Sequence, residues 1–250
     1  MRDSRLPLEG QVALVTGSAR RLGAAIVRRF HAAGANVVVH YRASSAEAEA
    51  LLAGLNAARP GSATGHAADL LDVAALPGIV EAAVSAFGRL DILVNSASTF
   101  YATPIGEVTP EAWDDLMGTN LKAPLFLSQA AAPELRRSRG LIINMVDIHG
   151  QRPLRRFPLY CAAKAGLIML TRSLARELGP EVRVNGIAPG PVLWPETGYD
   201  AGLKADIVGR TALKREGSAD DIVRAAFFFA TEAPYVTGQI LAVDGGRSLA

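Results

Sequence analysis

The residues with the clearest chemical potential are Tyr160 and Lys164, which form a Tyr-x-x-x-Lys pair in the stretch NMVDIHGQRPLRRFPLYCAAK. If this segment is helical, the two side chains leave the same face about one turn apart. A neighbouring ammonium stabilises a phenolate, so we expect Lys164 to lower the pKa of Tyr160 toward that of a working general acid or base. The same spacing also occurs by chance in alanine-rich helices, where the two residues only pack. Other motifs in the chain are needed to distinguish a catalytic pair from a packing pair.

A second chemical feature is the turn TGSARRLG, residues 16–23, which lies between an apolar run and an amphipathic segment. We expect a buried strand over residues 12–15 and a helix over residues 22–33. The backbone N–H groups and the helix N-terminus in such a turn form a binding site for a pyrophosphate. Glycines at 17 and 23 permit the tight turn, whereas Arg21 replaces the middle glycine of the usual pattern and adds a cation.

The residues after the second expected strand, 36–40, indicate which dinucleotide would bind. An acid at this point normally holds a ribose 2′-hydroxyl, but no carboxylate occurs before Glu47. The donors available for a 2′-phosphate are instead His40, Arg42, Ser44, Arg20 and Arg21. The sequence therefore predicts NADP(H), the alternative being arginines that merely face solvent.

Strands and helices alternate along the rest of the chain. We expect strands over residues 63–68, 92–95, 141–145, 183–188 and 239–243, and helices over 45–58, 76–87, 111–135, 158–179 and from the Ser218 N-cap to 231. The helix over 111–135 is broken in character around Thr119 and Asn120. This order predicts an α/β class, a Rossmann-type doubly wound sheet of about seven parallel strands with helices on both faces, in a single domain over 1–250.

Ligands of such a sheet collect at the carboxyl ends of its strands, where Asp69, Asn95, Asp147 and Pro189 lie. The irregular stretch that follows the sixth strand, at about 189–213, is too long for a plain connection and predicts a substrate flap. The same stretch contains Trp194, which we expect to pack within the flap.

Composition narrows the class further. The chain has 250 residues, 50% of them hydrophobic, and a net charge of +2, which is too balanced to predict nucleic-acid binding. Arginines at 152, 155 and 156 indicate either a local anion site or a solvated face. The single cysteine, Cys161, excludes an internal disulfide and favours a small apolar role over redox chemistry. No membrane or secretory segment and no metal-ligand spacing is visible, so we expect a cytoplasmic protein without a metal or a membrane partner.

Several of these motifs together resemble the short-chain dehydrogenase/reductase superfamily over essentially the whole chain: TGSARRLG, ILVNSAS, Asn120, the Tyr160/Lys164 pair, PG after the sixth strand and VDGG. More narrowly, the chain is similar to pteridine reductases, through Arg21, HYRASSAEA, NSASTFYATP, NMVD in place of a usual serine, and PGPVLWPE. The resemblance implies a Rossmann fold, NADPH, a homotetramer, and a role in folate metabolism through reduction of dihydropterins or dihydrofolate.

The resemblance also implies roles for individual residues. Tyr160 is the proton donor, Lys164 orients the nicotinamide ribose, Asn120 supports a water relay, and Ser98 and Phe100 contact the pterin together with Asp147 and Tyr160. The cofactor contacts implied are Gly17, Arg20, Arg21, Leu22, Gly23, His40, Tyr41, Arg42, Ser44, Asp69, Leu70, Asn95, Ser96, Ala97, Tyr160, Lys164, Pro189 and Gly190. Two departures are Ser96, where a second asparagine is common, and the ending RSLA, which lacks an arginine used across some subunit interfaces and leaves the interface contribution open.

Asp147 supports the narrower reading on physical grounds. Carbonyl reduction builds negative charge on oxygen, which a serine hydroxyl stabilises and an ionised carboxylate repels. A ring C=N bond instead needs a proton on nitrogen, which a carboxyl kept protonated by burial and by the bound dinucleotide could help deliver through Tyr160. The alternatives are that Asp147 caps a loop or binds Arg152, and that Phe100 is simply packed under the flap.

The leading hypothesis is thus an NADPH-dependent pteridine reductase. The nearest competitor is a reductase of carbonyls such as 3-oxoacyl thioesters or small ketones. A nucleotide-sensing protein that kept the fold and lost turnover is the alternative from another class.

Overall fold

The computed structural model describes residues 6–194 and 200–249 and contains one seven-stranded sheet. All paired strands are parallel, in the order β3-β2-β1-β4-β5-β6-β7. The predicted fold class is confirmed. The strands are β1 (Val12–Val15), β2 (Asn36–Tyr41), β3 (Ala63–Ala67), β4 (Ile92–Asn95), β5 (Leu141–Met145), β6 (Arg183–Pro189) and β7 (Ile240–Val243).

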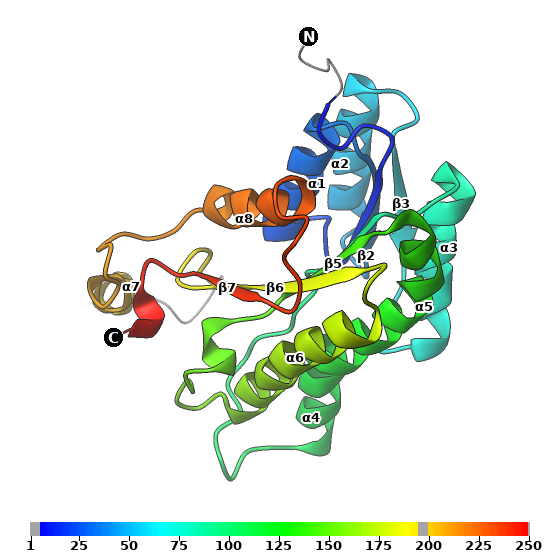
Figure 1. The fold of residues 1–250 in the computed structure, drawn as a ribbon. Coiled ribbons are helices and arrows are strands. Elements are labelled where there is room, and N and C mark those ends of the chain that lie inside the picture. The colour runs from blue at the N-terminus through cyan, green and yellow to red at the C-terminus, as the bar shows by residue number, and fades with distance from the viewer. Residues whose placement is uncertain (1–5, 195–199, 250) are drawn as a thin grey trace.

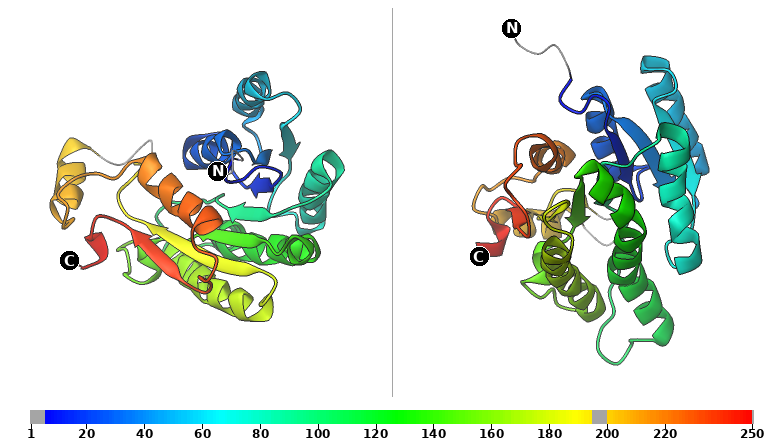
Figure 2. Two further views of the ribbon diagram at one scale, coloured as in Figure 1. Left: turned by 45° about the horizontal axis from the view of Figure 1, so that its top comes forward. Right: turned by 45° about the vertical axis from the view of Figure 1, so that its right-hand side comes forward.

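Helices cover both faces of the sheet, as Figures 1 and 2 show. On one face lie α1 (Arg21–Ala32), α2 (Ser45–Ala58) and α8 (Ala219–Thr231), and on the other lie α3 (Leu76–Phe87), α4 (Pro110–Met117), α5 (Ala123–Ser138) and α6 (Pro158–Glu177). A further helix, α7 (Ala201–Gly209), lies away from the sheet beside the short C-terminal turn Arg247–Leu249. No described helix is long and apolar enough to cross a membrane.

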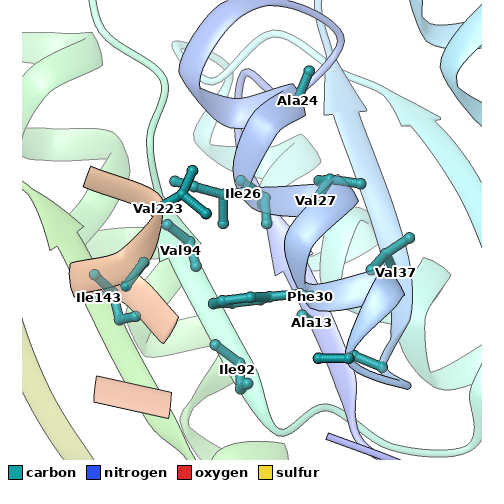
Figure 3. Close-up of a cluster of buried hydrophobic side chains, with 14 of the residues drawn as sticks. Ala13, Ala24, Ile26, Val27, Phe30, Val37, Ile92, Val94, Ile143 and Val223 are labelled. Carbon is teal, nitrogen blue, oxygen red and sulfur yellow. The ribbon is translucent and has the colours of Figure 1, made fainter. Parts of the chain in front are cut away.

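The central strands β1, β4 and β5 are buried on both faces because each face meets a helix layer. In β1, Ala13 and Val15 join one buried cluster, whereas Val12 and Leu14 join the other. Successive strand residues point to opposite faces, so a continuous apolar run is what a doubly covered strand requires. Phe30 of α1 is fully buried in the first cluster, among Ile92, Val94 and Ile143 (Figure 3).

Two local features differ from regular helix. The segment Gly118–Lys122 between α4 and α5 is π-helical, at the point where the sequence predicts a break. The stretch at 189–213 is not irregular throughout, because α7 lies within it. The Asp200 side chain caps the start of this helix by accepting a hydrogen bond from the backbone N–H of Leu203. Residues 195–199 of the predicted flap lie outside the described residues.

The chain crosses from one half of the sheet to the other between β3 and β4, so β1 and β4 are neighbours at the reversal point. Connections diverge from this point, and sheets of this kind bind ligands in a crevice at the carboxyl ends of the two strands, here β1 and β4. The glycine turn after β1 and the loop after β4 therefore face the same space.

Candidate active site

Thr16 joins the two loops at the reversal point. Its hydroxyl oxygen accepts hydrogen bonds from the backbone N–H groups of Ser96, at 2.9 Å, and Ala97, at 3.0 Å. Gly17 lies so close to this loop, with φ +61°, that a Cβ there would be 2.9 Å from the Ala97 Cα. The predicted residues Gly17, Ser96 and Ala97 are thus brought together. Sequence reasoning missed Thr16, although a threonine directly after a strand was visible.

His40 binds the backbone of the glycine turn, so its role differs from the predicted one. Its Nδ1 accepts from the Gly17 N–H at 3.2 Å, which leaves Nε2 as the protonated nitrogen that donates to the Ala68 carbonyl, also at 3.2 Å. Burial lowers the pKa of His40 to about 4. With both ring nitrogens engaged and no positive charge, this ring is unavailable as a donor to a 2′-phosphate.

The other predicted donors lie on the rim of the same crevice. Arg20 is 3.6 Å from the Glu47 carboxylate, and Arg42 is 3.9 Å from that of Asp69. All four side chains are about half exposed, so these ion pairs are weak and open to competition by an anion. Three further predicted residues lie near these arginines. Tyr41 precedes Arg42 and packs against the core, and Ser44 is the N-cap of α2. Leu70 is buried next to Asp69 in the chain.

Arg21 connects the glycine turn to the flap. Its guanidinium donates a 2.8 Å hydrogen bond to the Trp194 carbonyl, and its backbone has φ +52° at the first residue of α1. The turn beside it is tight, since a Cβ on Gly23 would be 2.6 Å from the Gly17 carbonyl oxygen. Leu22 is partly buried between these two residues. The helix thus begins one residue earlier than the sequence predicts.

Asp147 and Tyr160 form the chemical centre of the site. The Tyr160 hydroxyl donates a 2.7 Å hydrogen bond to one Asp147 oxygen, while the other oxygen accepts from the His149 N–H at 2.8 Å. Tyr160 lies in the first turn of α6, which begins at Pro158, a residue suited to the start of a helix. The alternative that Asp147 caps its loop is therefore also correct, but with one oxygen only.

The electrostatics of the pair differ from the expectation. Burial, then the charge of Asp147, raises the pKa of Tyr160 well above its ordinary value. Lys164 does not reach the hydroxyl, because its ammonium donates to the Met145 carbonyl at 2.9 Å and lies 5.6 Å from the centre of the phenol ring. The predicted lowering of the tyrosine pKa by Lys164 is wrong for this arrangement. Burial lowers the pKa of Lys164 itself to about 8.

Asn120 organises the loop after β4 from the π-helical segment. Its amide nitrogen donates to the carbonyls of Leu116 and Thr99, at 2.9 and 3.0 Å, and its oxygen accepts from the Ser98 hydroxyl at 2.6 Å. Ser98 also interacts with Tyr160, because a hydrogen bond between the two side chains lowers the tyrosine pKa and so opposes its rise. The predicted residues Asn120, Ser98 and Tyr160 are thus adjacent.

Asn95 belongs to a buried polar chain of side chains. Its side chain is buried and donates to Asn144 at 2.8 Å, and Asn144 donates in turn to Thr171 at 2.9 Å. This polar chain runs from β4 through β5 to α6. The amide of Asn95 therefore belongs to a buried polar chain that connects β4 and β5 to the helix that carries Tyr160.

Phe100 forms an aromatic wall beside the tyrosine. It meets the Tyr160 ring edge-on, with centroids 4.7 Å apart at 83°, and stacks on Phe157 at 4.6 Å and 15°. Its place beside Tyr160 suits contact with a flat ring substrate.

Two glycines allow close approaches around the site. A Cβ on Gly150 would be 2.9 Å from the backbone carbonyl of Lys164, so the loop that carries Asp147 presses directly on α6. Pro189, the last residue of β6, is followed by Gly190, where a Cβ would be 2.6 Å from the Asp244 Cα. In residues 6–194 and 200–249, no group of three His, Cys, Asp or Glu side chains is placed to hold a metal ion.

Comparisons with known proteins agree with this arrangement. The family model described as Enoyl-(Acyl carrier protein) reductase matches residues 17–248. Pteridine reductase 1 of Leishmania tarentolae is 37% identical, over 95% of this chain and 96% of its own. The 3-oxoacyl-[acyl-carrier-protein] reductase FabG of Staphylococcus aureus (strain Mu50) is 35% identical, over 94% and 96%.

Among solved structures, a blue fluorescent protein from a metagenomic library, crystallised in complex with NADPH, superimposes with a TM-score of 0.90 and 37% identity. That match covers 96% of this chain and 99% of the other. The family model, the relatives and the solved structure each match nearly the whole length, and the family model spans Gly17, Gly23 and the Tyr160/Lys164 helix. The chain therefore belongs to the short-chain dehydrogenase/reductase family of oxidoreductases.

Proposed function

We propose that this protein is an NADPH-dependent reductase that delivers hydride to a ring C=N bond of a dihydropterin or dihydrofolate, with Tyr160 as the proton donor. The observation that carries the proposal is the 2.7 Å hydrogen bond from Tyr160 to Asp147. A carboxyl group takes the place at which carbonyl reductases of this family use a serine. The 37% identity to a protein named pteridine reductase 1 supports the same choice.

The residues around the crevice fit a dinucleotide phosphate. The turn after β1 leads into the N-terminus of α1, whose N-cap residue, Arg20, makes no side-chain cap of its own. Arg20 and Arg42 place exposed guanidinium groups at the ends of β1 and β2, suited to a 2′-phosphate. When bound, NADPH supplies the hydride. Lys164 is almost fully buried, with its ammonium 5.6 Å from the centre of the Tyr160 ring, and suits a ribose hydroxyl.

The proton chemistry follows from the Asp147–Tyr160 contact. A raised pKa keeps Tyr160 protonated at neutral pH, which is the state of a donor rather than of a base. When Asp147 carries a proton, the same contact can run from the carboxyl to the phenol oxygen. Tyr160 then passes its own proton to the substrate nitrogen and takes up the one from Asp147, so no free phenolate accumulates in the buried site.

The experiment is NADPH consumption with dihydrobiopterin, dihydrofolate and acetoacetyl-coenzyme A, with NADH in parallel. We expect turnover of the dihydropterins with NADPH, and a loss of about 100-fold or more in Tyr160→Phe, in keeping with the size of general acid catalysis. Tyr235→Phe, at a fully exposed tyrosine, is the matched control and should retain activity. Full turnover of dihydrobiopterin by Tyr160→Phe would show that the assigned acid is wrong.

The second candidate is a reductase of 3-oxoacyl thioesters, which the 35% identity to FabG and the family description favour. In that reaction negative charge develops on the substrate oxygen, beside the Asp147 carboxyl. An ionised Asp147 would oppose this charge, so this second function requires the same protonated carboxyl that the proposed proton transfer uses. Robust activity on acetoacetyl-coenzyme A with none on either dihydropterin would select this second function.

A further inference from the structure

The loop between β5 and α6 carries three arginines that the proposed reaction does not use. Two of them, Arg155 and Arg156, line a surface cavity of about 420 Å³. The remaining lining residues are apolar or small: Pro104, Ile105, Pro153, Leu154, Pro158 and Cys161. The cavity thus combines an apolar floor with a positively charged rim.

This cavity adjoins the candidate active site. Pro158 and Cys161 belong to the first turn of α6, the same turn that holds Tyr160. Between the two, Phe157 stacks on Phe100, which itself meets the Tyr160 ring. Phe157, whose chain neighbours Arg156 and Pro158 line the cavity, thus links the cavity through Phe100 to the Tyr160 ring.

The charges on the rim are available to a ligand. Both arginines are exposed, and no carboxylate among residues 6–194 and 200–249 forms an ion pair with either one. Guanidinium groups bind carboxylates through paired hydrogen bonds. An apolar floor beside two such groups suits a flat apolar group that ends in a carboxylate.

The backbone supports a specific use for Arg156. This residue has φ +74°, a left-handed conformation that disfavours side chains other than glycine, asparagine and aspartate. Its carbonyl accepts a 2.7 Å hydrogen bond from the Thr103 N–H, which fixes the loop against the opposite wall of the cavity. An arginine in this conformation is a local cost, and local strain of this kind concentrates at binding sites.

We infer that the cavity is a subsite for the tail of an extended substrate, in which an aromatic ring lies on the apolar floor and a carboxylate pairs with Arg155 and Arg156. The p-aminobenzoyl-glutamate group of dihydrofolate has this chemistry. The inference rests on the proposed function, because the pterin end of the same molecule must react at Asp147 and Tyr160. The enzyme then prefers dihydrofolate to dihydropterins without a charged tail.

The test compares steady-state kinetics of dihydrofolate and dihydrobiopterin in Arg155→Ala and Arg156→Gly. Glycine at 156 keeps the left-handed backbone while it removes the guanidinium. We expect KM for dihydrofolate to rise roughly tenfold with kcat unchanged, and KM for dihydrobiopterin to stay the same. Arg152→Ala removes an equal charge from the same loop outside the cavity lining and should alter neither KM. Equal changes for both substrates, or none, would overturn the subsite.

A binding measurement separates this inference from the proposed function. Free p-aminobenzoyl-glutamate should give saturation-transfer NMR signals with the wild-type protein and with Arg152→Ala, and lose them with Arg155→Ala. Wild-type protein that binds this fragment but reduces neither dihydropterin would keep the subsite and refute the function. Absence of fragment binding would refute the subsite, even if both dihydropterins were reduced. An arginine effect confined to acetoacetyl-coenzyme A would refute both.

Discussion

Asp147 and Tyr160 share a hydrogen bond of 2.7 Å in which the tyrosine is only 4% exposed. Burial is the largest cause of the raised tyrosine pKa, and the charge of Asp147 is the next. Asp147→Asn removes that charge at nearly constant shape, so we expect the pKa of Tyr160 to fall. The measurement is ultraviolet difference titration of the phenol, with Tyr160→Phe to identify its signal. An unchanged or higher tyrosine pKa in the asparagine variant would contradict the assigned role of the carboxylate.

Lys164 makes stability depend on alkaline pH. Its pKa in the folded protein is about 8, against 10.5 for the free side chain. Between these values the unfolded chain binds more protons, so the free energy of unfolding rises with pH across the window, by at most about 3 kcal/mol. The variant Lys164→Met has no titrating group here, so its free energy of unfolding lacks this dependence on pH. Urea unfolding at pH 8 and at pH 10.5 should show the wild type gaining stability relative to the variant, and a constant difference would argue against the shift.

His40 has the corresponding effect in acid. Its pKa is lowered from 6.5 to about 4, so the unfolded chain binds more protons between these values and stability falls as the pH drops. The loss by pH 4 is at most about 3 kcal/mol. His40→Asn can keep an acceptor for the Gly17 N–H but does not titrate. The stability advantage of the wild type should therefore shrink from pH 7 to pH 4, as followed by urea unfolding, whereas a fixed advantage would count against a neutral buried ring.

Arg42 should set the preference between the two dinucleotides. Its guanidinium is 61% exposed and only loosely paired with Asp69, so it can turn to a 2′-phosphate. We expect Arg42→Ala to weaken NADPH binding roughly tenfold and to leave NADH binding nearly unchanged. Fluorescence titration with both dinucleotides measures this, with Arg28→Ala on α1 as the matched exposed arginine. Equal losses for the two dinucleotides would remove Arg42 from the phosphate site.

Much of the fold could be predicted because it depends on local periodicity. Apolar runs such as residues 12–15 and 92–95 have the length and composition of doubly buried strands, and the observed strands have the same bounds. The break near Asn120 could also be predicted, because Gly118 and Thr119 are poor helix formers. The helix α7 was missed because its neighbours in the chain are rich in glycine and proline.

The positions of the polar side-chain atoms in the site could not be predicted from the spacing of residues in the sequence. An i, i+4 pair places Tyr160 and Lys164 on one face, but the position of the ammonium depends on the Met145 carbonyl at the end of β5. Likewise, a histidine beside arginines resembles an anion site until the fold buries it between Gly17 and Ala68. In both cases a distant backbone group decides the hydrogen bond.

The close approach at Gly150 connects the segments that carry two ionisable residues of the candidate site. The loop on its N-terminal side carries Asp147, and the helix backbone that it touches carries Lys164. A single added methyl group there would push the loop that carries Asp147 away from the helix backbone at Lys164. The spacing between the Asp147 loop and α6 is therefore set by a residue that has no ionisable group of its own.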